Sequence, residues 1–189
     1  MPSDQTILAF DTSAAHCAAA LLSGGRVVTR CEAMGRGQAE RLMPLVQQVL
    51  DEEGLGFADL DRIGVGIGPG NFTGIRISVA AARGLALSLG IPAVGVSGLR
   101  ALQAGACQNV AAIMGPRETA YVQIGEASPA IVPVQDVPPD AARFDDPEAL
   151  VRSMVRIAAA AEPGIAPAPL YIRQADAAPS RDAPPVILE

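Results

Sequence analysis

The spacing of apolar and polar positions in the first part of the chain is typical of paired strands. Three apolar runs, separated by short turns, cover residues 5–10, 17–22 and 26–32. Gly24-Gly25 lies between the last two runs, where a tight hairpin turn is expected because glycine adopts positive φ angles freely. The pattern therefore predicts three successive antiparallel strands within residues 5–33.

From residue 38 onward, apolar positions at helical spacing alternate with short apolar runs. Leu42, Leu45, Val46, Val49 and Leu50 form one stripe of the first expected helix. The expected helices cover residues 38–53, 72–89, 99–106 and 147–161. The further expected strands cover residues 63–67, 93–96, 110–113, 120–124 and 170–173, and the proline-rich stretch 128–147 is expected to be loop and edge strand.

The order of these elements predicts the fold class. Three strands followed by helix, strand, helix, strand and helix is the layout of a ribonuclease-H-like lobe, which also builds the actin, sugar-kinase and Hsp70 ATPase (ASKHA) superfamily. We therefore expect an α/β protein with an N-terminal actin-like lobe over residues 1–106 and a reduced second lobe over 107–175. The Ala- and Pro-rich tail over 176–189 is expected to be disordered.

Composition excludes several kinds of chemistry. All 14 basic residues are arginine, so neither a Schiff-base lysine nor a P-loop lysine can exist in this sequence. The formal net charge of −6 disfavours unaided binding to nucleic acid. Three scattered cysteines and a single histidine, His16, argue against a zinc site or a disulfide framework. With no basic leader and no apolar run of about 20 residues, a soluble, cytoplasmic protein is expected.

The junction between the strand at 63–67 and the helix at 72–89 is rich in glycine. Free N–H groups at a helix start suit an anion, so a phosphate site is one interpretation. Its candidate residues are Asp11, Thr12, Gly68, Gly70, Asn71 and Arg76. The dinucleotide-binding pattern fails because Asn71 occupies the place of the third glycine, and no P-loop is present. Packing or contact with a partner protein is therefore the favoured interpretation.

The helix after this junction carries small residues on two faces. Gly74, Ser78, Ala82 and Ala86 form one stripe, and Ala80, Gly84 and Ser88 form another. Small side chains allow close helix packing, at the lower end of axis separations of ~8–10 Å. One face can lie on the sheet, and the other needs a second helix, either residues 38–53 or one from a partner. The alternative is an ordinary helix of an alanine-rich protein.

Several motifs together resemble the TsaB (YeaZ) family. The stretch 66–76 reads G-I-G-P-G-N-F-T-G-I-R and is long and specific. The other matching stretches are 7–13 (ILAFDTS), 42–45 (LMPL), 84–87 (GLAL), 95–97 (GVS) and 169–173 (PLYIR). Met114, Pro116 and Thr119 depart from the residues that the family usually carries before the tyrosine of the strand pair at 110–124.

The resemblance implies two actin-like lobes and a role in making threonylcarbamoyladenosine (t6A) at position 37 of tRNAs that decode ANN codons. The resemblance implies that such a protein pairs with a TsaD-like transferase, that a TsaE-like ATPase joins the pair, and that it forms a homodimer when alone. It further implies contact with tRNA only through the complex and no membrane partner. No cofactor is expected, and binding of ATP and Mg²⁺ is possible only in the assembled complex. The expected partner interface is Gln38, Arg41, Leu42, Leu45, Val49, Phe72, Thr73, Gly74, Ile75, Ile77, Ser78 and Ala81.

A non-catalytic role is expected, because the transferase of the family binds metal through two helical histidines and His16 lies on a predicted strand. Asp11 matches the first phosphate-loop carboxylate of the superfamily. It either stabilises its turn or remains from a magnesium site. The alternative function is a stand-alone ATP-dependent phosphotransferase of the actin/sugar-kinase superfamily. A nuclease would need clustered carboxylates, and only Asp11 is suitably placed.

Overall fold

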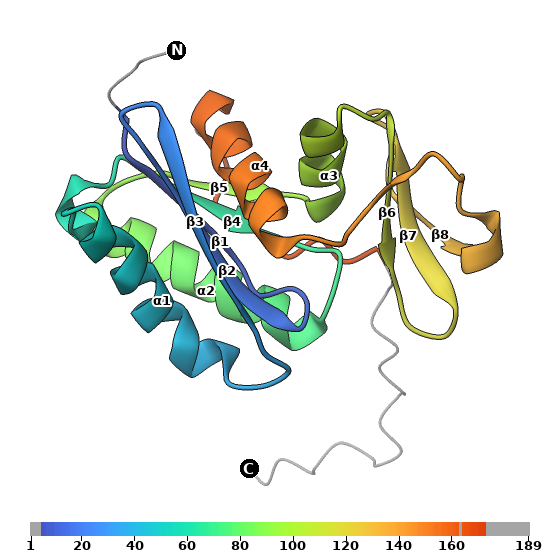
Figure 1. Cartoon of the computed structure of the whole chain (residues 1–189), viewed down its shortest axis with the longest axis horizontal. Coiled ribbons are helices and arrows are strands. Elements are labelled where there is room, and N and C mark those ends of the chain that lie inside the picture. The colour runs from blue at the N-terminus through green and yellow to red at the C-terminus, as the bar shows by residue number, and fades with distance from the viewer. Residues whose placement is uncertain (1–4, 163, 173–189) are drawn as a thin grey trace, which may run out of the picture.

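The protein contains two sheets that lie side by side, as the computed structural model shows for residues 5–162 and 164–172 (Figure 1). The first sheet has the order β3-β2-β1-β4-β5. Its strands are β1 (Ile7–Asp11), β2 (His16–Ser23), β3 (Arg26–Ala33), β4 (Arg62–Gly66) and β5 (Ala93–Val96). The first three pair antiparallel, whereas β1, β4 and β5 run parallel. The three predicted antiparallel strands are thus confirmed.

The helices cover both faces of this sheet. On one face lie α1 (Gln38–Glu52) and α2 (Phe72–Leu89), with the short 3₁₀ turn η1 (Phe57–Asp59) before β4. On the other face lies α4 (Pro147–Ala160), and α3 (Gly98–Ala106) packs between α4 and the second sheet (Figure 1). The predicted bounds of α2 and β5 agree with the structure at both ends.

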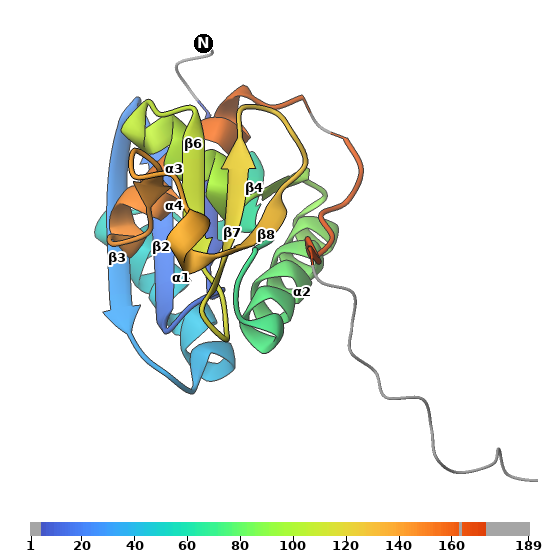
Figure 2. The ribbon, with the colours of Figure 1, turned by 90° about the vertical axis from the view of Figure 1, so that its right-hand side faces the viewer.

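The second sheet is smaller and has the order β8-β7-β6-β9. Its strands are β6 (Val110–Met114), β7 (Thr119–Ile124), β8 (Ala130–Pro133) and β9 (Ala142–Arg143), with the 3₁₀ turn η2 (Val134–Asp136) between the last two. Figure 2 shows this sheet towards the viewer, with α2 along one side of the molecule. The proline-rich stretch after residue 128 forms loop and short edge strands, as expected.

Burial on both faces explains the sequence of the central strands. Every residue of β1 and β4 is buried, which gives an apolar run rather than alternation. Leu8 and Phe10 face the cluster under α1 and α2, whereas Ile7 and Ala9 face the cluster under α4. The low aromatic content is accommodated because small and aliphatic side chains let the layers pack closely.

Helix α4 packs on the first sheet, although its sequence position suggested the second lobe at 107–175. Its buried face, which includes Val151, Met154 and Val155, belongs to the same cluster as Ile7 and Ala9. The physical reason is that the open face of the first sheet needs a covering layer, and β9 leads the chain back to it. An amphipathic stripe specifies a helix, but it does not specify the sheet that the helix covers.

A buried arginine fixes the end of α4. Arg62, on β4, donates from Nη1 to the carbonyl oxygens of Ala158 and Ala161, both at 2.6 Å. The last carbonyls of a helix lack intrahelical donors and carry partial negative charge, so a cation there satisfies both needs. The first sheet and α4 are thereby joined by hydrogen bonds as well as by apolar packing.

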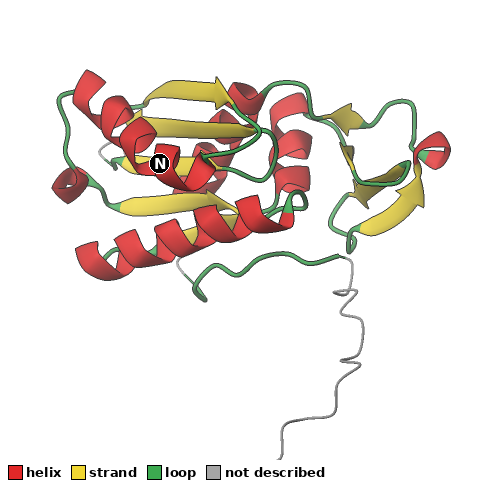
Figure 3. Cartoon of the chain, turned by 90° about the horizontal axis from the view of Figure 1, so that it is seen from below, coloured by secondary structure: helices red, strands yellow, loops and turns green. Residues whose placement is uncertain are grey.

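The strand predicted at 170–173 is wrong for the described part of that segment. Residues 170–172 form no strand, and Figure 3 shows the stretch as loop. Leu170 donates one backbone hydrogen bond to Ile67, at 2.8 Å. Pro169 has no N–H to extend that pairing. Arg173 and the tail at 176–189 lie outside the described residues.

One helix bears on the expectation that no apolar run is long enough to span a membrane. By length and composition alone, helix α2 is long and apolar enough to cross a membrane, and 28% of its 18-residue window is buried in the structure. The same criterion is met by core helices of soluble proteins. Helix α2 packs one face, with Ile75, Val79 and Ala82, against the first sheet.

Candidate functional site

The glycine-rich junction between β4 and α2 presses against the turn between β1 and β2. A Cβ atom added at Gly66 would lie 1.9 Å from Oδ1 of Asp11. One added at Gly74 would lie 1.9 Å from the carbonyl oxygen of Thr12. No side chain fits at such separations, so the glycines are explained by close contact with residues 11–13 rather than by turn flexibility alone.

Hydrogen bonds join the turn and the start of α2 into one unit. The N–H of Asn71 donates to the carbonyl of Ser13 at 2.6 Å, and Oγ1 of Thr12 donates to the carbonyl of Gly74 at 2.7 Å. Asn71 also caps α2, because its Oδ1 accepts from the N–H of Gly74 at 2.9 Å. Two of the N–H groups that an anion would need, those of residues 71 and 74, are therefore already bonded within the protein.

Asp11 holds its own turn together. Its Oδ2 accepts from the N–H and Oγ of Ser13 at 2.9 and 2.8 Å and lies 2.8 Å from Nε2 of His16. The carboxylate and the imidazole are both buried, and the ring of Phe144 stacks on His16. This geometry favours the interpretation of Asp11 as a turn-stabilising residue. The His16 contact was missed from sequence, because it arises only when β1 and β2 pair.

A cavity of about 940 Å³ opens between the two sheets. Its walls come from the β1–β2 turn, the β4–α2 junction, the β6–β7 turn and the segment 170–172. Apolar side chains such as Ile75, Ile113 and Phe144 form much of the surface. Among the described residues, Arg76 is the single charged side chain in this lining, which contains no carboxylate.

Arg76 is held at this cavity by two aromatic residues. Its guanidinium carbon lies 3.7 Å above the ring of Phe72, and its Nε donates to the hydroxyl of Tyr171 at 2.8 Å. The two rings lie 5.3 Å apart, centre to centre. Tyr171 comes from the segment after α4, so it reaches α2 from a distant part of the sequence. Its motif was noted in the sequence, but its contact with Arg76 was not predicted.

The six predicted anion-contact residues separate into two groups. Gly70, Asn71 and Arg76 line the cavity. Asp11, Thr12 and Gly68 are buried and do not line it; Oδ2 of Asp11 and Oγ1 of Thr12 support the turn and the junction, whereas Oδ1 of Asp11 has no hydrogen-bond partner among the described residues. The carbonyl of Gly68, for example, accepts from the N–H of Gly98 at 2.9 Å. These three residues do not line the cavity of the isolated chain, and their contact with a ligand in the assembled complex stays a prediction.

Half of the predicted interface residues are buried within the chain. Leu42, Leu45 and Val49 face the first sheet from α1, and Gly74, Ile75 and Ser78 face it from α2. The reason is that the apolar stripe of each helix covers its own sheet, which leaves the opposite stripe for a partner. The members that remain at least partly exposed are Gln38, Arg41, Phe72, Thr73, Ile77 and Ala81.

Comparisons with known proteins identify the family. The model of the family described as TsaD, tRNA N6-adenosine threonylcarbamoyltransferase, matches residues 31–128. The curated protein "tRNA threonylcarbamoyladenosine biosynthesis protein TsaB" of Escherichia coli is 40% identical over 100 residues, which cover 53% of this chain and 43% of that protein. The corresponding protein of Bacillus subtilis is 40% identical over 100 residues, covering 52% and 44%.

A solved structure described as YeaZ from Pseudomonas aeruginosa superposes with a TM-score of 0.74 at 29% identity, covering 88% of this chain and 99% of that one. The chain belongs to the TsaB (YeaZ) family. The resemblance in the junction motif and the actin-like α/β fold are thus confirmed. As a TsaB-family member, the chain spans about half the length of the curated relatives it matches.

Proposed function

We propose that this TsaB-family chain acts in t6A biosynthesis as a non-catalytic subunit that pairs with a TsaD-like transferase. The names of its curated relatives support the pathway. The observation that carries the pairing is the outer face of α2, where a Cβ atom added at Gly84 would meet nothing within 4 Å and Leu87 is 86% exposed. Ala80, Gly84 and Ser88 form an exposed stripe of small residues on this face, which allows close approach of a second helix.

Charge on the same surface supports a two-fold arrangement. The outer face of α2 carries exposed Arg83, whereas α1 beside it carries exposed Glu40 and Asp51. A partner of the same fold, turned by a two-fold rotation, would place the carboxylates of its α1 against Arg83. A second copy of the chain satisfies the same geometry, so we propose that a homodimer forms in the absence of the TsaD-like partner.

A non-catalytic role agrees with the use of the polar residues in the fold. Asp11, the carboxylate that matches the phosphate loop of the superfamily, bonds to His16 inside the turn. The proposal also includes a cytoplasmic location and contact with a TsaE-like ATPase. In the assembled complex it further includes binding of ATP and Mg²⁺ and access to tRNA.

The experiment is co-purification with the TsaD-like subunit, combined with measurement of t6A in a depleted strain. Gly84→Arg places a long side chain on the exposed face of α2 and is expected to abolish pairing. Ala104→Arg, at an exposed position of α3, is the matched control and is expected to pair normally. Normal pairing by Gly84→Arg would refute the assignment of the pairing surface to α2. Normal t6A levels after depletion of this protein would refute its role in t6A biosynthesis. Substitutions at buried Leu45 would instead test folding.

A further inference from the structure

The cavity between the sheets is not lined by Arg83, Gly84 or Leu87 of the proposed pairing surface, and it has a distinctive chemistry. Its volume of about 940 Å³ is that of a small-molecule site. Its lining combines an apolar wall, which includes Ile113, Tyr121 and Phe144, with the single charged group of Arg76. In a chain of net charge −6, a cavity whose described lining holds one cation and no carboxylate favours an anionic guest.

The orientation of Arg76 is set before any ligand arrives. Stacking on Phe72 and the hydrogen bond from Nε to Tyr171 fix the plane of the guanidinium. Within the described residues, its two terminal nitrogens donate to no protein group. A planar guanidinium with free terminal nitrogens matches the oxygens of a carboxylate, a sulfonate or a phosphate.

We propose that this cavity binds a small aromatic anion that carries one negatively charged group. The ring lies against the apolar wall, and the charged group meets Arg76. One cation balances one anionic group, whereas a nucleoside triphosphate would bring several charges to a cavity with no second arginine in its described lining. The site belongs to the isolated chain, so it does not depend on pairing with a TsaD-like protein.

Two fluorescent probes with the same ring system test the proposal on the isolated chain. Anilinonaphthalene sulfonate carries the anionic group, and phenyl-naphthylamine lacks it. The sulfonate is expected to bind at one saturable site about tenfold more tightly than the neutral probe, and Arg76→Gln is expected to remove this difference. Tyr171→Phe, which keeps the ring but loses the hydroxyl, is expected to reduce the difference by a smaller factor.

Two further variants locate the binding. Arg83→Gln changes an exposed arginine of α2 outside the cavity lining and is expected to leave both affinities unchanged. Ala15→Trp extends an exposed lining residue into the cavity and is expected to weaken both probes. Equal affinity for the two probes, an unchanged difference in Arg76→Gln or unchanged binding in Ala15→Trp would overturn the proposal. Strong thermal stabilisation by Mg-ATP would overturn the proposal that the ligand carries a single negatively charged group.

Discussion

Two glycines of α2 offer the same substitution in opposite surroundings. Gly84 lies in the exposed middle of the helix, and a Cβ atom there would meet nothing within 4 Å. Alanine is favoured over glycine in a helix interior by about 1 kcal/mol, so Gly84→Ala is expected to stabilise the isolated chain by about that amount. Gly74 lies in the first turn, where a Cβ atom would lie 1.9 Å from the carbonyl oxygen of Thr12.

The clash at Gly74 cannot be relieved by a side-chain rotation. The oxygen belongs to the backbone of the β1–β2 turn, and Thr12 is also bonded to the carbonyl of Gly74. Overpacking of this kind costs about 1–3 kcal/mol or more, which exceeds the gain in helix propensity. For a chain of this size, each kcal/mol corresponds to about 2–4 °C in the melting temperature. Gly84→Ala should therefore raise the melting temperature, and Gly74→Ala should lower it.

Thermal and urea unfolding of the two variants, compared with the unaltered chain, measure both effects. The difference between them isolates the contact with the turn, because the propensity change is similar in both. If Gly74→Ala were as stabilising as Gly84→Ala, the close contact between the junction and residues 11–13 would not exist in solution. In that case, close packing against the turn would not be the reason for the glycines of the motif.

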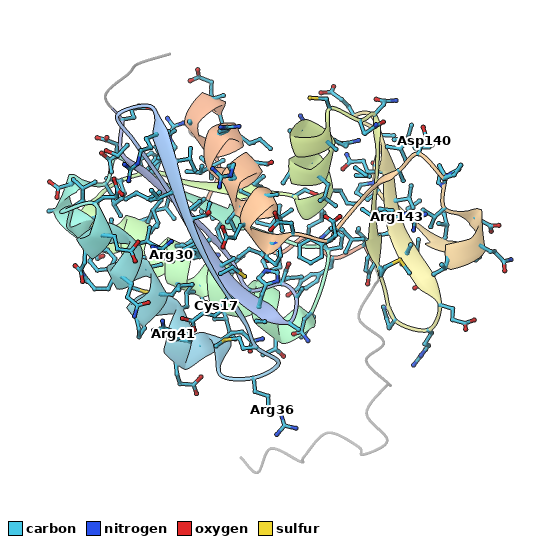
Figure 4. All side chains as sticks on the ribbon, viewed as in Figure 1. Cys17, Arg30, Arg36, Arg41, Asp140 and Arg143 are labelled. Atoms are coloured by element: carbon cyan, nitrogen blue, oxygen red, sulfur yellow. The ribbon has the colours of Figure 1, made fainter. Side chains whose placement is uncertain are left out.

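Two other changes test buried groups. Arg62→Met is expected to lower the free energy of unfolding by about 1–3 kcal/mol and to speed hydrogen exchange in the last turn of α4, because its carbonyls lose their donor; unchanged exchange there would contradict the role of Arg62. Burial raises the pKa of the Cys17 thiol, which lies between the first sheet and α1 (Figure 4), from 9.0 to about 12. The unfolded chain therefore ionises first, and stability is lost as the pH rises above about 9. Between pH 8 and pH 10 the unaltered chain should lose about 1.4 kcal/mol that Cys17→Ala does not lose, and equal losses would contradict this.

The sequence of the junction was informative because its glycines are closely spaced and local. They predicted a tight connection between a strand and a helix, and the family motif that contains them was confirmed. The choice between an anion site and packing could not be made from spacing, because it depends on what lies opposite. The structure places the β1–β2 turn there and bonds the N–H of Asn71 to the carbonyl of Ser13.

The predicted partner interface could not be located from sequence alone. Helical periodicity identified the apolar stripes of α1 and α2 correctly, but a stripe is the same in sequence whether it covers a sheet or meets another protein. In the structure, Leu45 and Ile75 belong to the core, whereas Leu87 is exposed. Only the position of the sheet decides which stripe is available to a partner.

Local patterns in the sequence were enough to predict the order of the helices and of the main strands, with most bounds displaced by a residue or two, together with the actin-like fold class and the family. These features depend on periodicity, turn residues and a continuous motif. Three-dimensional packing, in contrast, was needed to show that α4 covers the first sheet, that His16 meets Asp11, and that Tyr171 orients Arg76. Each of these contacts joins groups whose approach depends on how strands pair and layers stack. That arrangement is a property of the whole chain, since burial of apolar surface is optimised over all elements together.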